Sequence, residues 1–187
     1  MEKGLIKTFI RGREYTFLTA SGLFSYKRID NGTRLLVESM VIPQKGLFLD
    51  MGCGIGVIGL VAARENPELN VVMIDINPRA VMIASENVER MGLENVEVLE
   101  GFLYEPVEGR IFNTIVSNPP VSAGMSRIVE PLVKNASKHL ASEGSIQLVI
   151  QSQKGGNTLA EYMTEAFGEY KILARSGGYR VLISTTN

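Results

Sequence analysis

The tetrapeptide Ser117-Asn118-Pro119-Pro120 ends an apolar run with an amide side chain and two residues that lack an N–H. Proline cannot donate to a β-ladder, and the first proline pushes Asn118 away from the helical conformation. The run is therefore predicted to be a buried strand that stops at a rigid corner, residues 110–118. At this corner the Asn118 side-chain oxygen and the Pro119 carbonyl are fixed hydrogen-bond acceptors. Because Asn-Pro also starts ordinary turns, the corner alone does not define a site.

The segment Asp50-Met51-Gly52-Cys53-Gly54-Ile55-Gly56 is a second candidate. It lies between an apolar run and a helical pattern, where glycines let the backbone approach a ligand. Asp75 ends the next apolar run, where its carboxylate can accept hydrogen bonds from a ribose diol. Because ligands of open α/β sheets bind beyond the carboxyl ends of the strands, we expect a nucleoside-bearing cofactor.

Two cofactor classes fit this loop. Gly54, Gly56 and Gly59 partly match the G-x-G-x-x-G spacing of dinucleotide-binding proteins, so an NAD(P)-binding oxidoreductase is one alternative. Asp50, however, would repel a pyrophosphate. S-adenosylmethionine carries an ammonium and a sulfonium, so an acidic loop is compatible with it and favours this cofactor.

Alternating patterns predict the elements that position these residues. Strands are expected over residues 46–52, 70–76, 95–101, 110–118 and 145–152, and helices over 57–65, 77–92, 127–144 and 157–168. Gly177-Gly178 is predicted to turn the last two strands into a hairpin, and residues 5–19 form another hairpin. This order indicates an α/β fold, with a mostly parallel sheet, helices on both faces, an antiparallel C-terminal hairpin and a short N-terminal β extension.

Composition excludes several classes of protein. The 187 residues are 45% hydrophobic with a net charge of −1, so any polyanion contact must be local. Cys53 is the one cysteine and His139 the one histidine, which excludes an internal disulfide and makes a metal site unexpected. We expect His139 to be a solvated surface residue. The lack of a signal peptide or membrane span predicts a cytoplasmic protein.

Basic residues outnumber acidic ones in the N-terminal segment. The basic residues are Lys3, Lys7, Arg11, Arg13, Lys27, Arg28 and Arg34. They could contact a polyanion or form an ordinary solvated face.

Three segments carry a resemblance to a known family. Asp50 to Gly56 resembles the first motif of class I S-adenosylmethionine-dependent methyltransferases, whose Rossmann-like, seven-stranded sheet ends in an antiparallel hairpin. SNPPV resembles the [DNS]-P-P-[aromatic] motif of amino-group methyltransferases. Residues 22–40, GLFSYKRIDNGTRLLVESM, resemble the segment before the cofactor loop in the small methyltransferase family, which includes guanine-N2 methyltransferases of small-subunit ribosomal RNA. Through SNPPVSAG and QSQKGGNTLAEYM, the likeness covers most of the chain.

The resemblance implies cofactor-binding residues. They are Thr33, Asp50, Gly52, Cys53, Gly54, Gly56, Asp75, Ile76 and Phe102. Gly52 to Gly54 would contact the methionine portion and Thr33 would lie near its carboxylate. Asp75 would bind the ribose and Ile76 would pack on adenine. Phe102 stands where many relatives have an acid, so adenine contact is expected from backbone and packing.

The resemblance also implies residues on the substrate side. Asn118, Pro119 and Pro120 would be catalytic, because the Asn118 oxygen and the Pro119 carbonyl can hold an amine in line with the methyl donor. Val121 replaces the aromatic residue that stacks on the target base in many relatives. Phe24 and Tyr26 are then candidates for stacking, and Ser25 would border the substrate opening with Phe24.

The predicted function is N-methylation of an exocyclic amine, and the preferred substrate is guanine N2 of small-subunit ribosomal RNA. The expected partner is this RNA or the small ribosomal subunit. Alternatives are methylation of protein glutamine or adenine N6, NAD(P)-dependent oxidation, and non-catalytic RNA binding. Val121 disfavours the first two, since those enzymes usually keep an aromatic residue there. We expect one methyltransferase domain over residues 1–187, with residues 1–34 as the hairpin extension and substrate-side segment and 35–187 as the cofactor-binding core.

Overall fold

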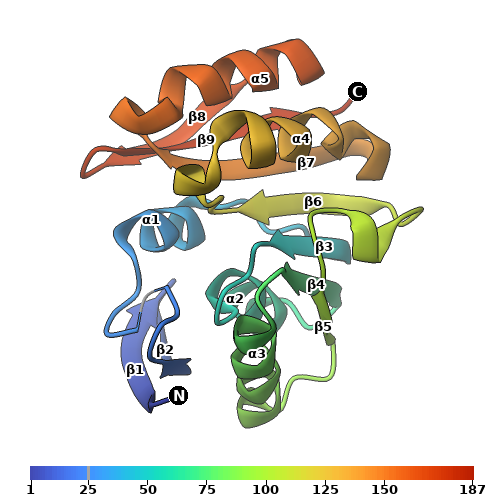
Figure 1. The fold of residues 1–187 in the computed structure, drawn as a ribbon. Helices are drawn as coiled ribbons and strands as arrows, with labels where there is room; N and C mark the ends of the chain where they lie inside the picture. The colour runs from blue at the N-terminus through green and yellow to red at the C-terminus, as the bar shows by residue number, and fades with distance from the viewer. Residues whose placement is uncertain (25) are drawn as a thin grey trace.

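The computed structural model describes residues 1–24 and 26–187 and contains a seven-stranded sheet with the order β5-β4-β3-β6-β7-β9-β8 (Figure 1). The strands are β3 (Gly46–Met51), β4 (Leu69–Asp75), β5 (Val96–Glu100), β6 (Phe112–Ser117), β7 (Leu140–Gln151), β8 (Lys171–Ser176) and β9 (Tyr179–Thr185). Strands β3 to β7 pair in parallel, whereas β9 is antiparallel to both β7 and β8. This confirms the predicted fold class.

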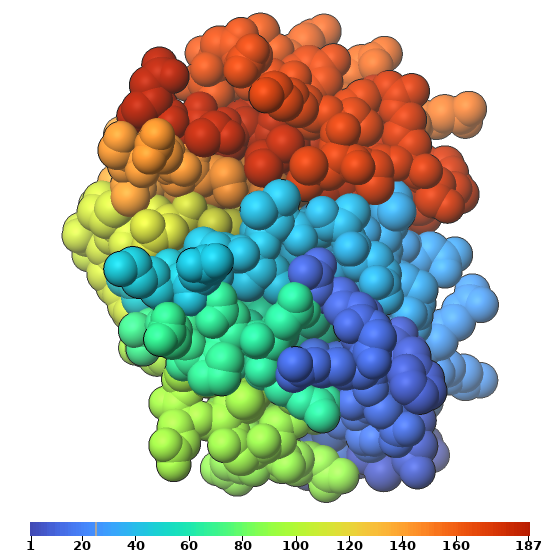
Figure 2. Space-filling model, turned by 180° about the vertical axis from the view of Figure 1, so that it is seen from behind, coloured from blue at the N-terminus to red at the C-terminus, as the bar shows by residue number. Residues whose placement is uncertain are grey.

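A separate two-stranded sheet precedes this core. It pairs β1 (Lys3–Ile10) with β2 (Arg13–Ala20), as the N-terminal hairpin pattern predicts. In the space-filling view the hairpin lies at one side of the molecule, and the segment that contains helix α1 (Asn31–Ser39) lies between it and the C-terminal strands (Figure 2). The expected boundary between the N-terminal extension and the cofactor-binding core, at residue 34, falls inside α1.

Two apolar clusters cover the two faces of the sheet. Helices α1, α2 (Val57–Glu65) and α3 (Pro78–Met91) pack with the hairpin in one cluster, and α4 (Glu130–Lys134) and α5 (Asn157–Phe167) pack in the other. Successive side chains of a strand point to opposite faces of the sheet, so neighbouring residues such as Phe48 and Leu49 of β3 belong to different clusters. In the part of the chain that the structure describes, none of the helices has the length and apolar character needed to cross a membrane.

The helix predicted over residues 127–144 is shorter than expected. A π-helical turn, η3 (Met125–Val129), leads into α4, which ends at Lys134; a 3-10 turn, Ala136–His139, follows, and β7 begins at Leu140. Leu140 is buried and pairs with Phe112 of β6, while Glu143 takes a left-handed conformation (φ 61°) beside this irregular pairing. Strand pairing therefore overrides the helical pattern of this segment.

The prediction that His139 is a solvated surface residue is wrong. Its side chain is buried, its ring stacks on Tyr104 with 4.4 Å between centroids, and Nδ1 lies 3.1 Å from the carbonyl oxygen of Arg110. The early start of β7 places this residue against the sheet, where an aromatic ring and a backbone acceptor satisfy it.

Candidate functional site

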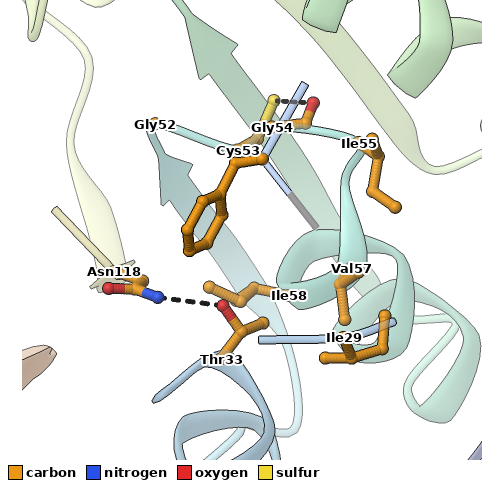
Figure 3. A pocket seen from close by; sticks show the side chains of 10 residues that line it. Ile29, Thr33, Gly52, Cys53, Gly54, Ile55, Val57, Ile58 and Asn118 are labelled. Carbon is orange, nitrogen blue, oxygen red and sulfur yellow. Dashed lines mark hydrogen bonds between the residues drawn. The ribbon is translucent and has the colours of Figure 1, made fainter. Parts of the chain in front are cut away.

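A cavity of about 920 Å³ opens beyond the carboxyl ends of the parallel strands. Of the predicted site residues, Phe24, Gly52, Gly54, Asp75, Ile76, Phe102, Asn118, Pro119, Pro120 and Val121 line it. A smaller hollow of about 50 Å³ is lined by Thr33 and Cys53, and it shares Phe24, Gly52, Gly54 and Asn118 with the larger one (Figure 3). The fold thus brings together residues from five loops at the edge where a parallel sheet binds ligands.

Backbone hydrogen bonds hold the glycine loop open toward this cavity. The N–H groups of Gly52 and Cys53 both donate to the carbonyl oxygen of Ile74, each at 2.8 Å. Gly52 and Gly54 have φ values of 72° and 56°, which favour glycine, and among the described residues beyond their chain neighbours no atom lies within 4 Å of a Cβ built at either position. The loop therefore presents bare backbone to the cavity.

Asp75 connects this loop to the next strand. Its Oδ2 accepts from the Gly54 N–H at 2.8 Å and its Oδ1 accepts from the Asn77 N–H at 2.9 Å. A carboxylate has about four lone-pair sites, so each oxygen can accept a further hydrogen bond from a diol. Beside it, Ile76 is 63% exposed and Phe102 lines the same cavity. A carboxylate next to apolar side chains fits an adenosine group.

Asp50 lies beneath the loop rather than in the cavity wall. Its side chain is fully buried and Oδ2 accepts from the Gly59 N–H at 2.9 Å, whereas Oδ1 has no hydrogen-bond partner among the residues that the structure describes. Burial raises the pKa of Asp50 to about 7, with a smaller increase from the charge of Asp75, although the Gly59 N–H opposes it. An unpartnered acidic oxygen under the loop suits the cationic methionine portion of S-adenosylmethionine better than a pyrophosphate.

The Asn118 corner is anchored by residues that precede and begin α1. The Asn118 Nδ2 donates to Asp30 Oδ2 at 3.1 Å and to Thr33 Oγ1 at 3.0 Å. Asp30 also caps α1, since the same oxygen accepts from the Thr33 N–H at 3.1 Å. Because a carboxylate only accepts, the amide nitrogen must face Asp30, which turns the Asn118 oxygen away from Thr33 (Figure 3). The side-chain oxygen is thereby oriented as an acceptor at the cavity.

Three predicted residues do not line either hollow: Asp50, Gly56 and Tyr26. Gly56 is the N-cap of α2 with φ 97°, and a Cβ there would lie 3.0 Å from both Leu60 Cδ1 and Met73 Cε, so its place is set by packing. Tyr26 lies beside β1, where its Cε2 is 3.7 Å from the position of a Cβ on Gly4. Ser25 lies outside the described residues.

Several cavity residues were not predicted. They include the charged and polar residues Asp30, Arg127, Gln151, Lys154 and Tyr179. The spacing of Asp30 and Thr33 is an N-cap signal that could have identified the first. The others reach the cavity through the order of β6, β7 and β9, which no local motif reveals.

Comparisons with known proteins identify the family of this chain. The sequence profile of the methyltransferase small domain matches residues 14–183. The uncharacterized protein YbxB of Bacillus subtilis is 35% identical over 175 residues, which cover 92% of this chain and 87% of YbxB. Ribosomal RNA small subunit methyltransferase C of Escherichia coli is 31% identical over 172 residues, which cover 89% of this chain and 48% of that protein.

A solved structure is similar over nearly the whole chain. The Thermus thermophilus 16S rRNA N2 G1207 methyltransferase (RsmC), solved with AdoMet and guanosine, has a TM-score of 0.87 and 25% identity, and the match covers 99% of this chain and 51% of that one. The chain thus spans about half the length of the two named methyltransferases. It belongs to the methyltransferase small domain family and is an S-adenosylmethionine-dependent methyltransferase.

Proposed function

We propose that this chain methylates the exocyclic N2 amine of a guanine in small-subunit ribosomal RNA. The orientation of Asn118 carries the proposal, because Asp30 and Thr33 bind its amide nitrogen, and its oxygen therefore faces away from them at the wall of the cavity that Asn118 lines. Two relatives of this chain are named as methyltransferases of small-subunit ribosomal RNA, one of them at guanine N2. The alternatives, glutamine or adenine N6, would use the same pair of acceptors but receive no such support.

The cofactor would bind along the carboxyl ends of β3, β4 and β5. In this assignment the backbone of Gly52 to Gly54 contacts the methionine portion, with Thr33 near its carboxylate and Asp50 setting the loop. Asp75 binds the ribose, and Ile76 and Phe102 enclose the adenine, all on the wall that these residues already form. When bound, S-adenosylmethionine supplies a methyl group on a sulfonium.

The chain's own contribution is to orient the amine. The lone pair of an exocyclic amine is delocalised into the ring, so the nitrogen is a weak nucleophile. The Asn118 oxygen and the Pro119 carbonyl accept its two N–H bonds and direct the lone pair at the methyl donor, and the diproline keeps both acceptors in place. As the nitrogen loses electron density during transfer, its N–H groups become stronger donors, so both acceptors bind the transition state more tightly than the substrate.

The target base needs an apolar surface beside these acceptors. Phe24 lines both hollows and is 66% exposed, so it is our candidate for stacking on the base. Val121 begins the 3-10 turn after the diproline and packs against the apolar cluster of α4 and α5. We assign it a packing role at the cavity wall. We also propose that residues 1–34, apart from Thr33, lie on the substrate side and that residues 35–187 form the cofactor-binding core.

Methyl transfer from a tritium-labelled donor tests this function. Purified protein is incubated with total RNA and, separately, with total protein from cells that lack its gene, and labelled RNA is digested to nucleosides. We expect label in small-subunit ribosomal RNA that migrates as N2-methylguanosine. Label in protein glutamine or in N6-methyladenine would contradict the proposed substrate. Calorimetric binding of NAD(H) without binding of S-adenosylmethionine would contradict the reaction as well.

A further inference from the structure

Two cations, Arg127 and Lys154, line the cavity that contains Asn118. Both side chains are exposed, and within residues 1–24 and 26–187 neither makes an ion pair or a side-chain hydrogen bond. Other surface cations of this chain, such as Lys134 and Arg110, are paired with carboxylates. Arg127 and Lys154 are therefore available to an anionic ligand at the cavity.

Packing between their two segments holds these cations on one wall. Arg127 belongs to η3, and Lys154 to a second irregular turn, η5 (Ser152–Gly156). Gly155 has φ 111°, which favours glycine, and Met125 Sδ lies 2.8 Å from the position of a Cβ on Gly155, so the two turns lie against each other. The two cations thus come from turns that contact each other.

The turn that carries Lys154 is also fixed to the C-terminal hairpin. The Ser152 N–H donates to the Gly178 carbonyl at 2.8 Å, and Arg180 Nε donates to Ser152 Oγ at 3.0 Å. A cation on an anchored turn loses less conformational freedom when it binds a ligand than one on a loose loop.

Outside this wall, the cations of the N-terminal segment are the other candidates for contact with a polyanion. The net charge is −1, so no overall field attracts a polyanion. Among the N-terminal cations, Lys3 pairs with Glu86 at 2.9 Å, Arg11 binds Glu65 at 2.9 Å, and Arg34 donates to the Phe9 carbonyl at 3.0 Å. These three residues connect the hairpin to α3, α2 and α1, so the interpretation of an ordinary surface is supported for these three residues.

We propose that Arg127 and Lys154 form a phosphate-binding subsite that holds the RNA backbone next to the target nucleotide. This inference rests on the proposed function, because a glutamine side chain would bring no phosphate to this wall. The Arg127 guanidinium can bind a phosphate through two parallel N–H bonds, and the Lys154 ammonium acts as a point charge. With the backbone held there, the base can enter the cavity toward Asn118.

The test measures KM for deproteinised small-subunit ribosomal RNA between about 50 and about 200 mM KCl, since contacts to phosphate release counterions. For Arg127→Ala/Lys154→Ala, the slope of log(1/KM) against log[KCl] should be shallower than in the wild type by about 1 per lost contact, about 2 in total. Arg127→Lys should keep most of the slope, because the charge remains. Unchanged affinity for S-adenosylmethionine shows that the variants are folded.

Arg90→Ala/Lys138→Ala is the matched control. It also removes one arginine and one lysine, but Arg90 lies in the last turn of α3 and Lys138 in the 3-10 turn that precedes β7, at the edge of the sheet opposite the cavity. Its slope should equal that of the wild type. If wild-type protein methylates the RNA but both double variants keep the wild-type slope, or lose slope equally, the subsite is refuted and the proposed function stands. Wild-type protein that transfers no methyl to RNA would overturn both.

Discussion

The anchoring of Asn118 by Asp30 predicts a specific defect for Asp30→Ala. The substitution removes the N-cap of α1, which accepts from the Thr33 N–H at 3.1 Å, and one of the two acceptors of the Asn118 amide, also at 3.1 Å. Thr33 Oγ1 remains as the second acceptor at 3.0 Å. The Asn118 side chain should then sample orientations in which its oxygen no longer accepts from the substrate amine.

The two losses have different magnitudes. Loss of the cap should cost about 1 kcal/mol of the free energy of unfolding. For a domain of this size, that lowers Tm by about 2 to 4 °C. A hydrogen bond to a charged group contributes about 1.5 to 3 kcal/mol, which limits the rate loss to about 10- to 100-fold. Because Thr33 still binds the amide, we expect kcat to fall about 10-fold, the lower end of that range.

Steady-state kinetics with ribosomal RNA, together with thermal unfolding, separates these effects. Asn caps helices as well as Asp, so Asp30→Asn should restore Tm but recover only part of kcat, since it offers a neutral acceptor. In an Asn118→Ala background, Asp30→Ala should cause no further loss of kcat, because it acts through Asn118. If Asp30→Ala left kcat intact, or if its loss simply added to that of Asn118→Ala, this role of Asp30 would be refuted.

Two further predictions concern the carboxylates of the cofactor loop. Asp75→Ala should weaken S-adenosylmethionine binding by about 10-fold or more in calorimetry, because a charged acceptor for the ribose and the Gly54 contact are lost together; unchanged affinity would exclude Asp75 from the cofactor site. The pKa of Asp50 is raised from 3.8 to about 7, so the folded state binds a proton more tightly than the unfolded state and stability should fall as pH rises between these values. From about pH 5 to about pH 8, the free energy of unfolding of the cofactor-free wild type should fall by about 3 kcal/mol relative to that of Asp50→Asn, measured by urea unfolding. Parallel pH profiles of the two proteins would show that Asp50 does not titrate in this way.

Local sequence patterns predicted most of the fold, because recognisable residues mark the end of each of these strands. The glycine loop after β3, Asp75 at the end of β4 and the diproline after β6 each follow a short apolar run, and parallel strands bring their carboxyl ends to one edge. The residues that we propose for cofactor binding and for catalysis are therefore predicted from the sequence to lie at one edge of the sheet.

Contacts between distant segments could not be predicted in this way. Asp30 and Asn118 are 88 residues apart, and nothing in either motif indicates that one carboxylate binds both the helix start and the amide. The burial of His139 depends on where β7 starts, which is set by the pairing of Leu140 with Phe112 rather than by helical periodicity. Lys154 reaches the cavity only because its turn is fixed to Met125 and to the C-terminal hairpin.

Asn118→Ala shows whether Asn118 orients the amine that receives the methyl group. The measurement compares single-turnover methyl transfer to small-subunit ribosomal RNA with the Kd for S-adenosylmethionine, for this variant and the wild type. We expect a Kd within a few-fold of the wild type and a transfer rate lower by about 100-fold or more, the loss typical of a transition-state contact. Transfer at the wild-type rate would show that Asn118 does not orient the amine.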